Sequence, residues 1–226
     1  MKKKLFWTIL ILIIIAIGAL AWHFFSPYKK ADMLNAIPQK PVFIIETDDS
    51  YDAWEKLTKS EVWGHLRKHQ LFAKVATGMD MIDTIVQSNE KLAKYLGKRN
   101  ILISMHMIGN NAYDFVYIVD LRRASKLATF NKVLKGFLSS NYEVKDYSHH
   151  GETIYKLTDT KSLTTVYLCF LNNLLVASFN PKLLESSVDQ YDNPELAKDN
   201  NFLTIHDKLK GEGLFRIFLN YAQLDD

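Results

Sequence analysis

The sequence predicts an α+β fold in which an N-terminal transmembrane helix is followed by a largely antiparallel sheet with helices packed on one face. Three observations support this prediction. An uninterrupted apolar segment lies near the N-terminus, and four strand-like segments with short connectors follow one another in the second half of the chain. The amphipathic helical segments are separated from these runs of strands. Such segregation of helices and strands is typical of α+β proteins.

The apolar segment extends from Leu5 to Phe25, and His23 is its only ionisable residue. A helix of this length rises about 30 Å, the thickness of a hydrocarbon core. Three lysines at residues 2–4 precede it, and positive charge favours the cytoplasmic side. We therefore predict a cytoplasmic tip and transmembrane anchor at residues 1–25, with the lipid bilayer as partner of Leu5 to Phe25. A cleaved signal peptide is the alternative, because "ALA" at residues 19–21 fits a cleavage site.

Residues 26–40 are predicted to form a linker, since Pro27 and Pro38 disfavour regular structure. Residues 41–226 are then expected to form one extracytoplasmic α+β domain. Its first strand is predicted at residues 42–47. Several helical pieces follow between Ser50 and Gly97, where Thr58 and Glu61 fit a capping box.

The remaining elements are assigned by periodicity and by their connectors. Two apolar runs separated by "GNN" predict a hairpin over residues 100–121, and an amphipathic helix follows over residues 122–138. Four strands with short turns predict an antiparallel meander over residues 142–179. Asn180 and Pro181 suit the start of a helix, a second helix is expected at residues 200–210, and a last strand at residues 214–221.

Charge and cysteine content argue against nucleic-acid binding and against a reactive thiol. The net charge is +3, and no basic run appears after Lys30, so nucleic acid is not expected as a partner. The single cysteine, Cys169, lies in the apolar run "TVYLCFL". A buried thiol is therefore expected there rather than a reactive one.

A cluster of acidic residues marks the end of the first strand in "FIIETDDSYDAW". Asp49 or Ser50 is placed to cap the following helix, and Asp52 suits the positive end of its dipole. The alternative is that Asp48 and Asp49 serve a metal ion or acid/base chemistry, which requires further ligands or a partner carboxylate from elsewhere. Capping is the simpler interpretation.

Histidines provide the other candidates. His149 and His150 lie in a predicted hairpin turn, which is a weak metal signal by itself. His65 and His69 have a spacing that places both on one helix face, but Leu66 stands where a metalloprotease would carry glutamate. We predict no catalytic, cofactor-binding or metal-binding residues and no cofactor. Asp48, Asp49, His149 and His150 remain weak functional candidates.

Several stretches resemble bacterial membrane-anchored proteins of a domain-of-unknown-function family (DUF 3352-like). They are the lysine-led anchor and "VFIIETDDSYDAWEKLTKSEVW", "ILISMH", "YDFVYIVDL", "LCFLNNLLVASF" and "LFRIFLNY". The resemblance implies an envelope protein with no assigned activity, so no catalytic residue is carried over. Members are typically longer, which leaves open that residues 41–226 are the N-terminal part of a longer architecture.

These observations favour a single-pass protein of the bacterial inner membrane, with the N-terminus cytoplasmic and the C-terminal domain periplasmic. We expect no enzyme activity but a binding or scaffolding role toward an envelope protein or ligand. Two alternatives remain open. One is an extracytoplasmic hydrolase or metal-dependent enzyme that uses the acidic strand end. The other is a lipid- or peptide-binding groove between the helices after Ser60 and the sheet.

Overall fold

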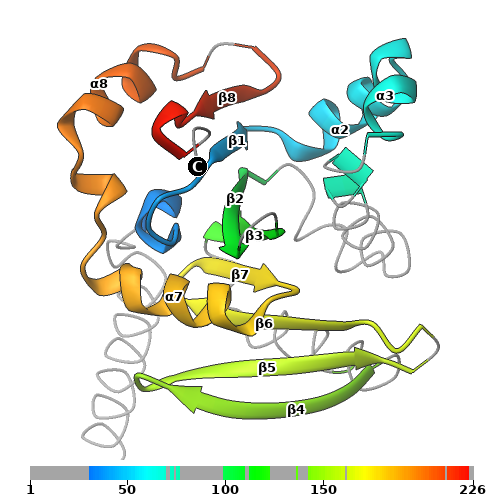
Figure 1. Cartoon of the computed structure of the whole chain (residues 1–226), viewed down its shortest axis with the longest axis vertical. Helices are drawn as coiled ribbons and strands as arrows, with labels where there is room; N and C mark the ends of the chain where they lie inside the picture. Colours follow the sequence, from blue (N-terminus) through cyan, green and yellow to red (C-terminus); the bar gives the residue numbers. More distant parts are fainter. Residues whose placement is uncertain are drawn as a thin grey trace, which may run out of the picture. The chain divides into compact units, whose positions relative to one another are not determined.

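A computed structural model of the chain describes residues 31–69, 72–73, 75–76, 99–109, 112–122, 136, 142–160, 162–211 and 213–223 (Figure 1). The chain divides into two compact units, Met1–Lys30 and Ala31–Asp226. The predicted anchor at Leu5 to Phe25 lies outside the described residues. Within the described part of the chain, no helix combines the length and apolar character needed to cross a membrane.

The described residues form an α+β fold built on one eight-stranded antiparallel sheet with the order β4-β5-β6-β7-β3-β2-β1-β8. The predicted α+β class and antiparallel sheet are confirmed. The strands are β1 (Phe43–Thr47), β2 (Ile101–Gly109), β3 (Ala112–Asp120), β4 (Tyr142–His149), β5 (Glu152–Asp159), β6 (Thr165–Leu171), β7 (Leu174–Ser178) and β8 (Arg216–Leu219).

Short turns produce most of the neighbouring pairs in the sheet. The β4–β5 hairpin turns at His150 and Gly151, whose φ angles of 47° and 88° are both positive. A two-residue turn of this kind matches the twist of the strands that it joins. Three pairings join segments far apart in the sequence: β3 pairs with β7, and β1 pairs with β2 on one side and with β8 on the other.

Three of the α-helices are capped by the side chain of the residue immediately before them. Asn180 accepts from the backbone N–H of Lys182 at the start of α7, and Asp199 caps α8. Ser60 accepts from the N–H of Trp63 and starts α3, so the capping box predicted at Thr58 is wrong by two residues. The helical elements are η1 (Met33–Ala36), α2 (Ser50–Thr58), α3 (Glu61–Leu66), α7 (Pro181–Asp192), η3 (Leu196–Lys198), α8 (Asn200–Lys208) and η4 (Tyr221–Gln223).

Residues 31–40, predicted to belong to a linker, pack as part of the domain. Ala31, Leu34, Ala36 and Ile37 are buried, and η1 contacts α7 and β3. The Asn173 side chain accepts from the N–H of Ala31 at 2.8 Å and donates to Asp120 Oδ1 at 2.6 Å. Burial of the apolar side chains overrides the local effect of Pro38, so the packed domain begins at Ala31 rather than at residue 41.

Both faces of the sheet carry a buried core, which corrects the expectation that one face alone is covered. Successive residues of a strand point to opposite faces, and in β3 Phe115 and Tyr117 join one core while Val116 and Ile118 join the other. Helix α7 packs on the second face through Leu184 and Val188, among others. The helical residue Val75 is buried in the core of the first face. The sequence missed this because buried strands lack the polar alternation that marks an exposed face.

Candidate functional site

A network of ionisable side chains lies at the C-terminal end of β1. Glu46 lies directly opposite Arg216, the first residue of β8. The Arg216 guanidinium donates to Glu46 Oε2 from Nη2 at 3.3 Å and from Nε at 3.4 Å. His206, on α8, places its Nε2 at 3.0 Å and 3.2 Å from the two carboxylate oxygens of Glu46. Two side chains that lie 160 and 170 positions after Glu46 in the chain therefore meet at its carboxylate.

The network is buried, although all three members are ionisable. Glu46 is 3% exposed, and His206 and Arg216 are each 8% exposed. Buried ionisable groups are stable only when they are paired. The pKa of Arg216 is raised above its usual value, first by its hydrogen bond to Asp48 and then by the charges of Asp48 and Glu46, against the opposing effect of burial. The guanidinium is therefore a permanent positive charge between two carboxylates.

The predicted acidic candidates have two different roles here. Asp48 accepts from Arg216 Nη1 at 2.7 Å and from Asn100 Nδ2 at 3.1 Å. Asp49 precedes α2, and its backbone oxygen accepts from the N–H of Ala53 at 3.0 Å. The interpretation of this cluster as a helix start fits Asp49, whereas Asp48 belongs to the ion-pair network.

Arg216 and His206 were not among the candidate residues predicted from the sequence. A signal was present, since Arg216 is the one charge within the apolar run "LFRIFL". An isolated charge in a strand that is otherwise apolar indicates a buried partner. His206 follows Phe202 by four residues, so both lie on one face of α8. The partner in each case comes from β1, which lies about 160 residues earlier in the chain.

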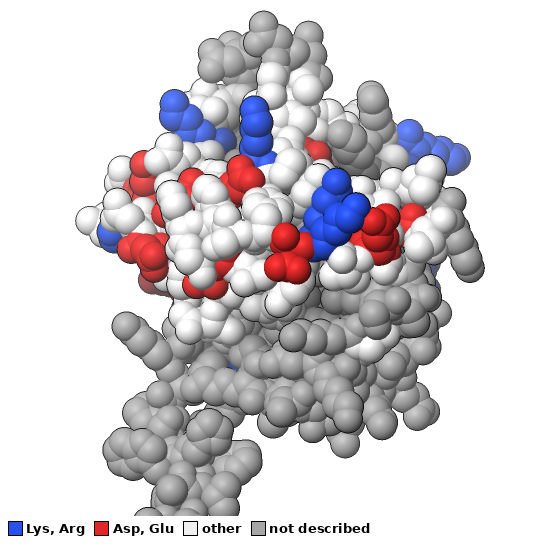
Figure 2. Space-filling model, turned by 90° about the horizontal axis from the view of Figure 1, so that it is seen from below, with Lys and Arg blue, Asp and Glu red and all other residues white. Residues whose placement is uncertain are grey.

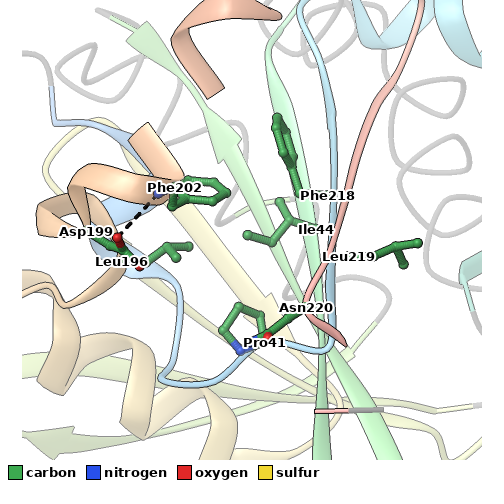
Figure 3. Close-up of a pocket in the computed structure, with 8 residues that line it drawn as sticks. All are labelled: Pro41, Ile44, Leu196, Asp199, Phe202, Phe218, Leu219 and Asn220. Carbon is green, nitrogen blue, oxygen red and sulfur yellow. Dashed lines mark hydrogen bonds between the residues drawn. The ribbon is translucent and has the colours of Figure 1, made fainter. Parts of the chain in front are cut away.

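A small cavity lies beside this network, between η3, α8 and the β1–β8 pair (Figure 3). Figure 3 shows Phe202 and Leu196 on one side and Ile44 and Phe218 on the other. Phe202 and Phe218, which line the cavity, contact each other with ring centroids 5.3 Å apart, and the His206 ring packs against both, at 5.6 Å and 5.5 Å. The lining residues are Pro41, Ile44, Leu196, Asp199, Phe202, Phe218, Leu219 and Asn220, and the volume is about 210 Å³.

His149 and His150, the other two predicted candidates, both contact the carboxylate of Asp189 at the opposite end of the sheet. His149 Nε2 lies 2.7 Å and His150 Nδ1 lies 2.8 Å from Asp189 Oδ1. The two imidazole rings stack with centroids 4.4 Å apart. Asp189 is on α7, 40 residues from His149 along the chain, and was not predicted as part of a site. Asp48 and Asp49 do not share this site, because they lie at the β1 end.

Cys169 and the pair His65 and His69 do not belong to either of these two groups of side chains. Cys169 is fully buried in β6, as expected, and burial raises the pKa of its thiol to about 12. It therefore stays protonated near neutral pH. His65 and His69 are exposed on and just after α3, and among the described residues they are not joined by a third metal-ligating side chain.

Comparisons with known proteins add no assignment. No family model, curated protein or solved structure matches this chain. The resemblance to the DUF 3352-like family therefore stays a prediction from sequence.

Proposed function

We propose that this chain is a membrane-anchored scaffold of the bacterial envelope, in which the extracytoplasmic domain binds a second copy of itself through the open edge of β8. The observation that carries the proposal is an apolar sheet edge exposed to solvent. Ile217 is 57% and Leu219 is 51% exposed, and Tyr221 just beyond them is 72% exposed. Strand edges with this composition are templates for pairing with another chain.

The two ends of the sheet differ in a way that supports this assignment. The edge strand β4 exposes Glu143, Lys145 and Asp146, and Lys145 forms an ion pair with Glu143 at 2.7 Å. Charged side chains of this kind are a common protection against edge pairing. Strand β8 exposes Ile217 and Leu219 instead, and its one charge, Arg216, is turned into the buried network. Charged side chains therefore protect the β4 edge, whereas the β8 edge lacks this protection.

A second copy of the chain suits this edge better than an unrelated charged partner. Two β8 strands meeting antiparallel about a two-fold axis would each present uncharged side chains, so no like charges would oppose one another. The strand is short, and we expect weak association in dilute solution. Anchoring both copies in one membrane would raise their effective concentration and favour the pair.

The arrangement at the β1 end favours binding over catalysis. A hydrolase that used Asp48 would need a carboxylate directed at a substrate, with a proton to give or take. Asp48 and Glu46 are instead bound to Arg216, and His206 contacts Glu46 in a buried position. Figure 2 shows basic and acidic side chains side by side on one face rather than a basic patch, which supports a partner other than nucleic acid. The groove expected between the sheet and the helices after Ser60 falls mostly outside the described residues.

Cross-linking in membranes tests the self-association. We expect Ile217→Cys in the full-length protein, treated in vesicles with a bismaleimide, to yield a covalent dimer. The native Cys169 is buried and contributes little background. Adding Leu219→Lys should reduce the dimer about tenfold or more, because it would bring one lysine from each copy into the same short interface.

The matched control places the cysteine on the other edge strand. Val144→Cys lies in β4, where Val144 is 39% exposed. Its dimer yield should stay at the level of random collision in the membrane. Equal yields from the two positions, or a yield from Ile217→Cys that Leu219→Lys leaves unchanged, would contradict the proposed edge.

The proposed location rests on Leu5 to Phe25 and on the lysines before it. It predicts that Leu163→Cys, in a turn where Leu163 is 75% exposed, reacts with an impermeant maleimide in intact spheroplasts. Lys3→Cys, at the predicted cytoplasmic tip, should react only after lysis. Labelling of Lys3→Cys alone in intact cells would reverse the proposed orientation, and labelling of neither would place the domain inside the cell.

A further inference from the structure

We propose that His149, His150 and Asp189 bind a zinc ion. The β4–β5 hairpin presents the two imidazoles, and α7 presents the carboxylate. One ligand atom from each of the three residues lies within 4.8 Å of the other two. This site is separate from the sheet edge at β8, and it does not depend on self-association.

The turn brings both histidines to the same side. Adjacent residues of a strand normally point to opposite faces of the sheet. His149 is the last residue of β4, and His150 follows with a φ of 47°, in the left-handed region. That backbone turn rotates the second imidazole toward the first, so both rings reach the single oxygen Asp189 Oδ1, at 2.7 Å and 2.8 Å.

The two elements that carry the ligands are already joined to each other. The Tyr147 hydroxyl donates to Glu185 Oε1 at 2.9 Å, and Glu185 lies one helical turn before Asp189 on α7. Buried Leu184 and Val188 hold the same stretch of α7 against the sheet. His149 on β4 and Asp189 on α7 therefore belong to packed elements, which position ligands more accurately than loops do, and His150 follows His149 directly in the turn.

The donor set suits zinc. Two imidazole nitrogens and one carboxylate oxygen form a site of the kind found in zinc proteins, with a fourth position open to water or to another molecule. Magnesium and calcium favour sites made of oxygen ligands alone, which makes them poor candidates here. Without a metal, a single carboxylate oxygen faces two stacked imidazoles, and a divalent cation would replace the protons that the rings donate.

Small movements would open the required space. With zinc bonds of about 2.0–2.2 Å, neighbouring ligand atoms of a tetrahedral site lie about 3.4 Å apart. The present separations from Asp189 Oδ1 are shorter by about 0.6 Å on that estimate. His149 is 24%, His150 is 71% and Asp189 is 44% exposed at the side chain. These side chains can therefore move apart by this distance while displacing few packed neighbours.

Calorimetric titration of the untagged full-length protein with zinc chloride tests the site. We expect saturable binding at one site per chain. Asp189→Asn and His150→Gln each remove a ligand without changing side-chain size much, and each should weaken binding at least tenfold. With Co²⁺ in place of zinc, the wild type should show the visible absorption of a four-coordinate ion, and both variants should lose it.

The pair His65 and His69 provides the control, because exposed histidines four apart could bind zinc by themselves. The double variant His65→Gln, His69→Gln should keep the wild-type affinity. Circular dichroism of each variant checks that the fold is retained. The proposal is overturned if the wild type does not saturate, if Asp189→Asn and His150→Gln bind as the wild type does, or if the control variant loses binding equally.

Discussion

Replacing Arg216 with methionine is expected to lower the free energy of unfolding by about 3 kcal/mol, within the range for breaking a buried ion pair. Methionine keeps much of the apolar volume of the arginine stem but removes the charge. Among the residues that the structure describes, Glu46, which is 3% exposed, would then keep only His206 as an ionisable partner. Asp48 adds less to the loss, since its side chain is 49% exposed and water can replace the guanidinium. Urea denaturation near neutral pH measures the change.

Two further variants serve as controls for the effect of Arg216→Met on stability. Lys59→Met removes a charge from an exposed pair with Glu55, whose atoms lie 2.6 Å apart, and should alter stability by about 0.5 kcal/mol or less. Combining Arg216→Met with Glu46→Gln removes the stranded charge and should recover about 1 kcal/mol or more. If Arg216→Met were no more destabilising than Lys59→Met, the network would not stabilise the β1–β8 pair.

His106 should make the protein less stable in weak acid. It is 2% exposed in β2, and its Nε2 lies 2.9 Å from Ser104 Oγ. Burial lowers its pKa to about 4, against a smaller raising effect from the backbone of Gln39. Between about pH 6.5 and about pH 4 the unfolded chain binds a proton at this residue and the folded chain does not. The stability contributed by neutral His106 is therefore lost as the pH falls through that window.

The size of this loss follows from the shift. Between about pH 7.5 and about pH 5, the free energy of unfolding should fall by about 2 kcal/mol because of His106, since one pKa unit corresponds to about 1.4 kcal/mol. We expect His106→Gln to show a pH dependence of unfolding that is flatter by this amount. His65→Gln, at an exposed position, should keep the wild-type dependence. Parallel curves for wild type and His106→Gln would show that this imidazole is protonated equally in both states.

Within the described residues, the sequence predicted the strands, the hairpins and the helices after Asn180 well, because the causes of these elements are local. Short apolar runs predicted the strands, and short polar connectors predicted the hairpins. The start of α7 was predicted from Asn180 and Pro181 alone, and the structure confirms the Asn180 cap. The misplaced cap of α3 is also local: Ser60 and Thr58 both have a suitable hydroxyl, and the chain path decides which one faces the helix.

The sequence predicted only some of the residues in each candidate site, because their partners come from distant parts of the chain. His149 and His150 attract notice as a pair, but Asp189 looks like any polar residue on a helix until α7 packs beside the hairpin. Asp48 and Asp49 look equivalent in the sequence, yet Asp48 accepts from Arg216, while Asp49 immediately precedes α2 and its backbone oxygen accepts from the N–H of Ala53. Each partner is set by packing between elements far apart in the chain.

By itself the sequence determined the α+β class, the antiparallel hairpins and the apolar character of Leu5 to Phe25, because periodicity and composition act over a few residues. Only the tertiary structure decided that β1 lies between β2 and β8, that Ala31 to Ile37 belong to the packed domain, and that Glu46 meets His206 and Arg216. These contacts join segments up to 170 residues apart. Burial of apolar surface and pairing of buried charge select them, and neither can be evaluated until the whole chain has folded.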